Sequence, residues 1–131
     1  MCVIYTSHIR YQGADGLDIT VKSATGIGRI LAPTWAIVLG VKHWRGYEPL
    51  TPEQYRHQYY ALLRERFRAD RQPFLDLLER ERLTLKCFCQ AGMFCHRHLA
   101  VDILEKIAAA NGIAVVRGGE LAVSGSAAQR T

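Results

Sequence analysis

The succession of a strand, a helix and a strand in the second half of the chain constrains its fold more than any other feature. An apolar, β-rich run at 83–89 gives way to a helical pattern at 95–110, which ends at the C-cap pair Asn111-Gly112. β-Formers return at 113–116. Such a connection forms a right-handed βαβ unit with parallel strands. The segment therefore predicts an α/β fold with a mainly parallel sheet.

The first half predicts two further strands and an irregular region. One strand is expected at 2–9, and a second at 16–24, where apolar and polar residues alternate. The GADG turn before the second strand allows the two to form a hairpin or neighbouring strands. Glycines and prolines punctuate 25–50, where a short helix is expected to begin near Pro33.

A clearly marked helix begins at Thr51. Thr51 is suited to the N-cap, Pro52 to the first helical position, and Gln54 completes a capping box. Its polar face carries arginines that we expect to be solvated, because acidic residues interrupt them: Arg56, Arg64, Arg66 and Arg68. A second helix follows, with Asp70 as its expected cap.

Size and composition indicate one domain. With 131 residues and 49% hydrophobic composition, the chain can bury an ordinary core. We expect a three-layer Rossmann-like α/β domain over 1–120 and a flexible, Gly-, Ser- and Ala-rich tail over 121–131. The chain has no signal-peptide pattern and no run approaching the roughly 20 apolar residues of a membrane helix. These features predict a cytoplasmic protein without a membrane partner.

Residues 87 to 98 hold three of the four cysteines and two of the five histidines. Alternation along the strand places Cys87 and Cys89 on one face, and we assign Cys87 to the core. Along the helix, an apolar stripe of Leu99, Ile103 and Ile107 is expected to face the sheet and to carry His96 inward. His98 falls on the opposite, solvated face.

Three interpretations of this cluster stay open. The first is an anion or nucleotide site at the helix N-terminus, formed by the loop around Gly92 with His96 and Arg97. The second is thiol chemistry, with Cys89 or Cys95 as nucleophile and His96 as base. The third is a zinc site, for which Cys89, Cys95 and the two histidines are suitable ligands. Because His96 and His98 project about 200° apart on a helix, we expect no metal and no cofactor.

Other polar residues are expected at the same sheet edge. Ser7 closes the first strand, and Lys22 and Ser23 close the second, where α/β proteins bind ligands. Trp35 and Trp44 are expected in the core rather than stacked on a base. The net charge of +5 is compatible with an anionic partner.

The segment LTLKCFCQAGMFCHRHLAVDIL resembles the signature of the DUF488 family, in particular its short, phage-associated branch. The opening VIYTS, LAPTW at 31–35 and LTPEQYRHQYY at 50–60 are also similar to that branch. The resemblance implies a compact α/β domain with a ligand site at the Cys-His-Arg turn. It favours His96 and Arg97 as functional residues, argues against obligatory zinc and supplies no substrate.

Together these patterns predict a protein that binds a small anionic ligand, such as a nucleotide or phosphorylated compound, at the turn between the strand 83–89 and the helix 95–110. An enzyme using His96 with Cys95 or Cys89 is one form of this hypothesis. The alternatives are a non-catalytic module that sequesters a nucleotide or binds nucleic acid, and a zinc-binding domain.

Overall fold

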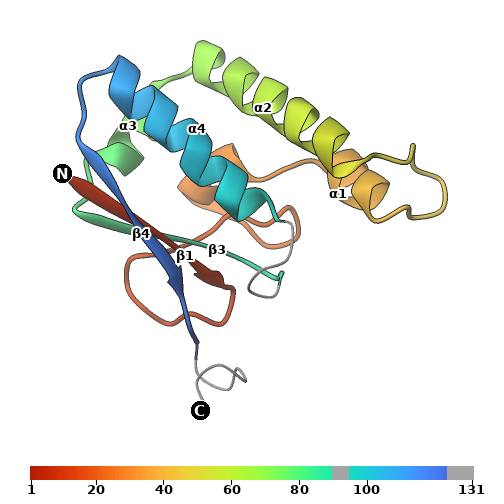
Figure 1. Ribbon diagram of the computed structural model, residues 1–131, viewed down its shortest axis with the longest axis horizontal. Coiled ribbons are helices and arrows are strands. Elements are labelled where there is room, and N and C mark those ends of the chain that lie inside the picture. Colours follow the sequence, from red (N-terminus) through yellow and green to blue (C-terminus); the bar gives the residue numbers. More distant parts are fainter. Residues whose placement is uncertain (90–94, 124–131) are drawn as a thin grey trace.

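A sheet of four parallel strands forms the centre of the molecule in the computed structural model, which describes residues 1–89 and 95–123 (Figure 1). The spatial order is β2-β3-β1-β4. The strands are β1 (Cys2–His8), β2 (Gly16–Asp18), β3 (Arg82–Cys87) and β4 (Val115–Leu121). This arrangement confirms the predicted Rossmann-like α/β class.

The helices lie on one side of the sheet, with α4 over the strands and α2 beside α4 (Figure 1). They are the 3-10 helix η1 (Gly26–Leu31) and the α-helices α1 (Trp35–Val41), α2 (Pro52–Ala69), α3 (Gln72–Leu78) and α4 (His96–Ala110). Within the described residues, none of these helices has the length and apolar character needed to cross a membrane.

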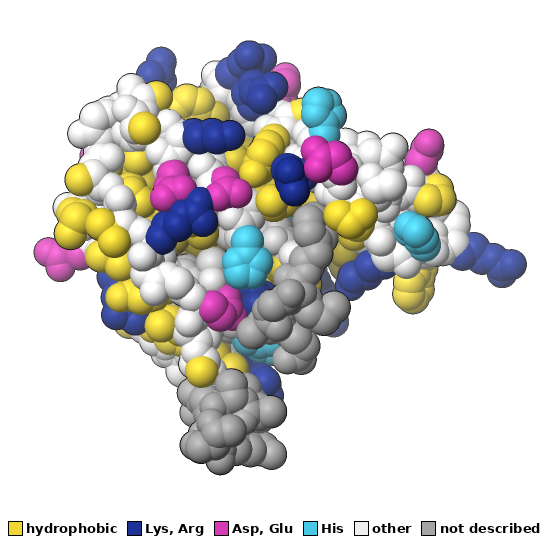
Figure 2. Space-filling model, viewed as in Figure 1, with side chains coloured by type: hydrophobic (Ala, Val, Ile, Leu, Met, Phe, Trp, Pro, Cys, Tyr) yellow, Lys and Arg dark blue, Asp and Glu magenta, His cyan; other side chains and the backbone are white. Residues whose placement is uncertain are grey.

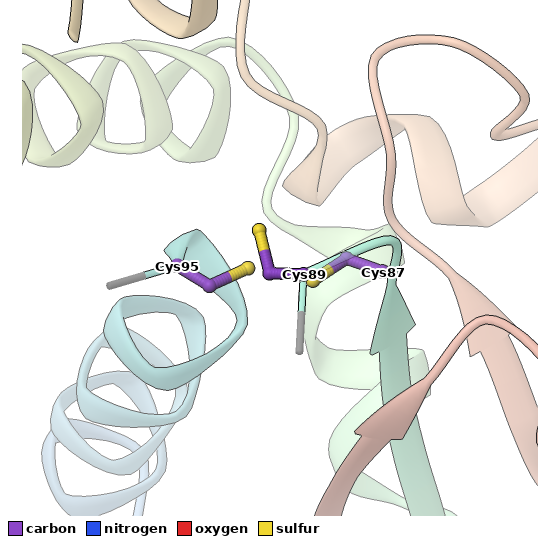
Figure 3. Close-up of side chains that lie close together, drawn as sticks. All are labelled: Cys87, Cys89 and Cys95. Carbon is purple, nitrogen blue, oxygen red and sulfur yellow. The ribbon is translucent and has the colours of Figure 1, made fainter. Parts of the chain in front are cut away.

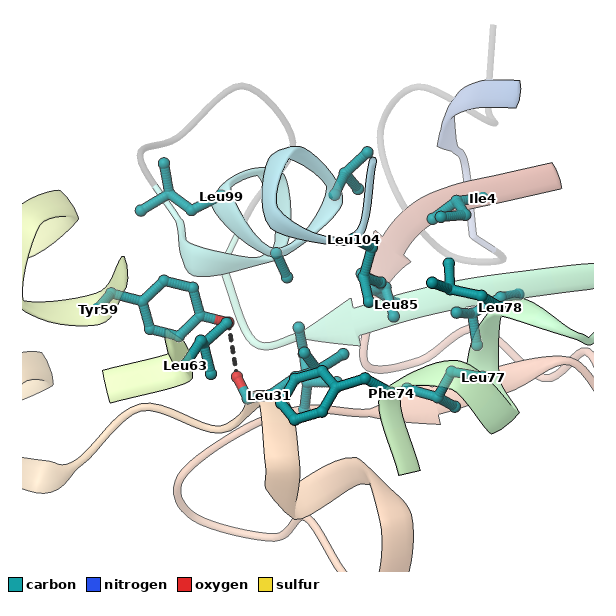
Figure 4. Close-up of a cluster of buried hydrophobic side chains, with 14 of the residues drawn as sticks. Ile4, Leu31, Tyr59, Leu63, Phe74, Leu77, Leu78, Leu85, Leu99 and Leu104 are labelled. Atoms are coloured by element: carbon teal, nitrogen blue, oxygen red, sulfur yellow. Dashed lines mark hydrogen bonds between the residues drawn. The ribbon is translucent and has the colours of Figure 1, made fainter. Parts of the chain in front are cut away.

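The hydrophobic core lies between the helices and one face of the sheet (Figure 4). Ile4 of β1 is in register with Leu83 of β3, so both side chains face the helices. Phe74 of α3 and Leu104 of α4 are fully buried against this face. In the same core the Tyr59 hydroxyl donates a 2.7 Å hydrogen bond to the Leu31 carbonyl, which ties α2 to η1.

The loop 9–15 contacts the opposite face of the sheet through Asp15. The Asp15 carboxylate accepts hydrogen bonds from Thr84 and Arg82 of β3 and from Tyr11. The Lys86 ammonium donates to the Tyr11 carbonyl. These contacts provide hydrogen-bond partners for Thr84 and Lys86, which alternate with the apolar residues of β3. The loop 9–15 therefore covers β3 on the face opposite the helices.

Several predicted boundaries differ from the structure. The strand expected at 16–24 ends at Asp18, where the Asp18 carboxylate accepts a hydrogen bond from the Thr20 amide and turns the chain. β1 and β2 do not pair, because β3 lies between them. The last strand extends to Leu121 instead of ending at 116, and Val123 is buried, so residues 121–123 belong to the domain. Residues 124–131 of the predicted tail lie outside the described residues.

The predicted signals at the start of α2 and at the end of α4 are confirmed, whereas Asp70 is the C-cap of α2 and Arg71, not Asp70, is the N-cap of α3. Thr51 and Gln54 form the expected capping box at the start of α2. At the end of α4, Asn111 is the C-cap and Gly112 follows with φ +68°, a conformation that favours glycine.

Two side-chain predictions are wrong. Trp35 and Trp44 are exposed rather than in the core: α1 buries Ile37 and Gly40 instead of Trp35, and Trp44 lies in the loop after α1. Arg66 was expected on a solvated face. Its guanidinium instead donates to carbonyl groups at the end of η1 and satisfies backbone acceptors there.

The face of α4 that contacts the sheet also differs from the prediction. Leu104 and Ala108 are fully buried on the sheet side, whereas Ile103 and Ile107 are half-buried and contact α2. The helix buries two faces because it lies between the sheet and α2. Apolar periodicity alone therefore cannot tell which of the two contacts the strands.

Candidate thiol site

Three cysteine side chains meet between the end of β3 and the start of α4 (Figure 3). The sulfur atoms of Cys87, Cys89 and Cys95 all lie within 4.8 Å of one another. Cys87 and Cys95 are buried and Cys89 is half-buried. β3 ends at Cys87 instead of reaching Cys89 as predicted, and Cys89 lies in the bend that follows the strand. The structure thus adds Cys87, which the sequence assigned to the core, to the predicted pair Cys89 and Cys95.

The close approach of the thiols changes their acidity. Hydrogen bonds from Cys87 and Cys95 lower the pKa of Cys89 well below its usual range, and the positive charges of Arg97 and Lys42 act in the same direction. Hydrogen bonding to Cys87 and Cys89, together with burial, raises the pKa of Cys95. These opposite shifts favour the thiolate form of Cys89 and the thiol form of Cys95.

Arg97 lies beneath the thiols and is completely buried. Its Nη1 donates to the Cys87 sulfur at 2.9 Å and to the Cys89 carbonyl at 2.8 Å. Its Nε and Nη2 donate to the two carboxylate oxygens of Glu120 at 3.2 and 3.0 Å. Burial disfavours the guanidinium charge, but Cys87 and Glu120 raise the pKa of Arg97. The Arg97 guanidinium, predicted to bind an anion, thus holds the Glu120 carboxylate.

A bulge in β4 brings Glu120 to this side of the sheet. Between Ile4 and Tyr5 the pairing of β1 with β4 shifts by one residue, so that Thr6 pairs with Glu120. Without this shift Glu120 would point to the opposite face. The bulge requires glycine, because a Cβ at Gly118 would lie 2.3 Å from the Tyr5 ring and Gly119 has φ +93°.

His96 is buried at the first position of α4, as predicted, and contacts Ile19, Cys95 and Tyr59. Its Nε2 lies 2.7 Å from the Ile19 carbonyl. A carbonyl only accepts, so Nε2 carries the proton and donates. Burial lowers the pKa of His96 and favours the neutral ring. The Nδ1 of that ring lies 3.8 Å from the Cys95 sulfur, within hydrogen-bond range of it.

The thiols open onto a pocket of about 300 Å³ at the carboxyl edge of the sheet. Lys22 follows β2 and Lys42 is the C-cap of α1, and both line the pocket. Trp35 and Phe88 also line it, each with 47% of its surface exposed. Apolar side chains of α1, with Tyr55, His96 and the three cysteines, form much of the remaining wall.

The other predicted site residues are not among the residues described at the thiol pocket. Ser7 donates to the Leu121 carbonyl, and Ser23 donates to the Asp18 carboxylate, so both hydroxyls serve local structure. Gly92 lies outside the described residues. His98 is half-buried and lines a small cavity with Thr6 and Glu120, away from the thiols.

Sequence reasoning missed Cys87, Lys42 and Glu120 as members of the site. The nearness of Cys87 to Cys89 in the sequence was a usable signal, because two thiols one residue apart can reach the same site. Glu120 and Lys42 had no comparable signal, because a bulge and a helix end bring them there.

Comparison of the chain with protein-family models, with curated proteins and with solved structures gives no match. The resemblance to the DUF488 family therefore stays a prediction that rests on the Cys-His-Arg motif.

Proposed function

We propose that this protein binds a small anionic ligand, of the nucleotide or phosphorylated-metabolite class, in the pocket beside the thiols. The supporting observation is that Lys22 and Lys42, from separate elements, line one pocket at the carboxyl edge of a parallel sheet. That edge is where α/β proteins bind their ligands. The volume of about 300 Å³ is at the lower end of the range for small-molecule sites.

The residues that line the pocket suit a ligand that has an anionic group and a planar, aromatic group. Lysine ammonium groups bind phosphate as mobile point charges. Trp35 and Phe88 offer exposed aromatic faces on which a base or another planar group can stack. The Lys22 ammonium lies 5.7 Å from the centre of the Phe88 ring, so the charged and the flat surfaces adjoin.

The thiols would contact such a ligand from one side. Cys89 is half-buried while its two partners are buried, so it is the sulfur that a ligand meets first. In an enzymatic form of the proposal Cys89 or Cys95 is the nucleophile, and the Nδ1 of His96 accepts the Cys95 proton. Ligand binding itself requires neither step.

A nucleic-acid surface on α2 is less well supported. Arg66 donates to backbone carbonyls of residues 29, 30 and 32 and is not available to phosphate. On the face in Figure 2, the described Lys and Arg side chains lie among Asp and Glu side chains instead of forming a continuous basic patch. A phosphate backbone needs a row of unpaired cations.

A thermal-shift and calorimetric screen of nucleotides and of inorganic phosphate tests the proposal. We expect at least one nucleotide to raise the melting temperature and to bind with a salt-sensitive affinity. Lys22→Ala and Lys42→Ala should each weaken binding by about tenfold, as expected for loss of one hydrogen bond to a charged group.

Lys106→Ala provides the matched control, because Lys106 is exposed on α4 beside the Tyr60 ring, outside the pocket lining. It should leave the affinity unchanged. If no small anion binds, or if an oligonucleotide binds with an affinity that depends on Arg64 and Arg68 instead of the two lysines, the proposal is wrong.

A further inference from the structure

The three thiols have the composition and spacing of a metal site. A tetrahedral zinc ion with Zn–S bonds of about 2.3 Å separates its sulfur ligands by about 3.8 Å. The sulfurs of Cys87, Cys89 and Cys95 already lie within 4.8 Å of one another, so small side-chain rotations bring them to that spacing. Cys95 begins a helix and Cys87 ends a strand, which fixes two of the three ligands on regular structure.

The surroundings suit a bound cation with thiolate ligands. Three thiolates and one zinc ion leave one net negative charge. The buried guanidinium of Arg97 offsets it and donates to the Cys87 sulfur at 2.9 Å. Glu120 holds Arg97 in place through both carboxylate oxygens. Metal sites use such outer hydrogen bonds to orient and stabilise their sulfur ligands.

From these observations we propose that Cys87, Cys89 and Cys95 bind one zinc ion as three thiolates. All three residues line the pocket, so the fourth coordination position opens onto it. Three protein ligands and one open position are the arrangement of catalytic rather than structural zinc sites. The zinc ligands considered from the sequence were Cys89, Cys95 and the two histidines. This assignment replaces the histidines with Cys87.

His96 lies beside this site without joining the three ligands. Its Nε2 donates to the Ile19 carbonyl, which fixes the ring, and its Nδ1 lies 3.8 Å from the Cys95 sulfur. The three cysteines therefore form the ligand set without the histidine. The inference goes beyond the proposed ligand binding, because the ion needs only the cysteines and binds whether or not the pocket holds an anion.

Elemental analysis of protein purified under reducing conditions without added metal tests the inference. We expect about one equivalent of zinc in the wild type and less than a tenth of that in Cys89→Ser and Cys95→Ser. Cys2→Ser is the control, because Cys2 is buried at the far end of β1, beside the Leu77 carbonyl. It should keep its zinc, and so should His96→Ala. Circular dichroism checks that each variant is folded.

A second measurement does not depend on the variants. Cobalt(II) added to the reduced, metal-free wild type should give intense thiolate-to-metal charge-transfer absorption and the visible bands of a tetrahedral site, saturating at one equivalent. Zinc should displace it. Absence of these bands from folded, fully reduced protein would refute the site, and copper at one equivalent in place of zinc would contradict the choice of ion. Loss of zinc from folded His96→Ala would show that the ligand set is not three thiolates.

Discussion

At the scale of single residues, the most informative side chain is Arg97. A fully buried guanidinium is costly unless every donor finds an acceptor. Here the acceptors are Glu120, the Cys87 sulfur and the Cys89 carbonyl. The arginine thereby connects β3, β4 and α4 directly beneath the thiols. These contacts hold the guanidinium against the Cys87 sulfur.

Arg97→Met should destabilise the protein by about 3 kcal/mol, because it leaves the Glu120 carboxylate and the Cys89 carbonyl without their buried partner. Urea unfolding measures the change. Arg117→Met is the matched control, since Arg117 pairs with Asp102 and Glu105 across the same two elements but at the surface. Its loss should cost about 0.5 kcal/mol. Equal costs for the two variants would contradict a structural role for the pair of buried Arg97 and partly exposed Glu120.

At the scale of elements, short irregular segments decide where the side chains of the strands point. The Gly118-Gly119 bulge turns Glu120 toward α4, and the loop 9–15 provides polar partners for the other face of β3. Asp15 is the residue of this loop that accepts the hydrogen bonds from β3. Burial alone would raise the pKa of Asp15, but hydrogen bonds from Thr84, Tyr11 and Arg82 lower it from 3.8 to about 2.

The lowered pKa of Asp15 predicts a defined pH dependence. Its contribution to stability is fully present above the unfolded value of 3.8 and is lost as the pH falls toward 2. Asp15→Asn should therefore cost about 1 to 3 kcal/mol at neutral pH and flatten the acid limb of the stability curve. Urea unfolding across this pH range measures both effects. A variant that keeps the wild-type acid limb would show that other carboxyl groups cause it.

At the scale of the whole molecule, α4 occupies the space between the sheet and α2, so it has two buried faces. Leu104 packs on the sheet side with Ile4 and Leu85 (Figure 4), whereas Ile103 and Ile107 contact α2. This placement directs the N-terminus of α4, with Cys95 and His96, to the carboxyl end of β3. The position of the candidate site is thus a result of how the helix packs.

Two alanine substitutions on neighbouring residues test this packing. Leu104→Ala should lower the free energy of unfolding by about 3 kcal/mol, because it leaves a cavity against the sheet. Ile103→Ala should cost about half as much, since its side chain is only partly removed from water. Chemical denaturation of the two variants gives the comparison. A larger loss for Ile103→Ala would support the orientation that the sequence predicts.

The sequence by itself determined the features that depend on local physics. The parallel α/β class follows from strand and helix periodicities, and the ends of α2 and α4 from Thr51, Gln54 and Gly112. The strand-to-helix turn at 89–95 also determined where the candidate site was predicted. Each of these depends on the spacing and chemistry of residues close together in the chain.

Tertiary structure decided which side chains meet at the candidate site between β3 and α4. It joined Cys87 to the other two thiols, paired Arg97 with Glu120 through a one-residue bulge, and brought Lys42 to the pocket from the end of α1. Periodicity cannot supply these contacts, because a helix with two buried faces and a strand with a register shift have more than one orientation consistent with their pattern. The choice among them comes from packing between distant elements.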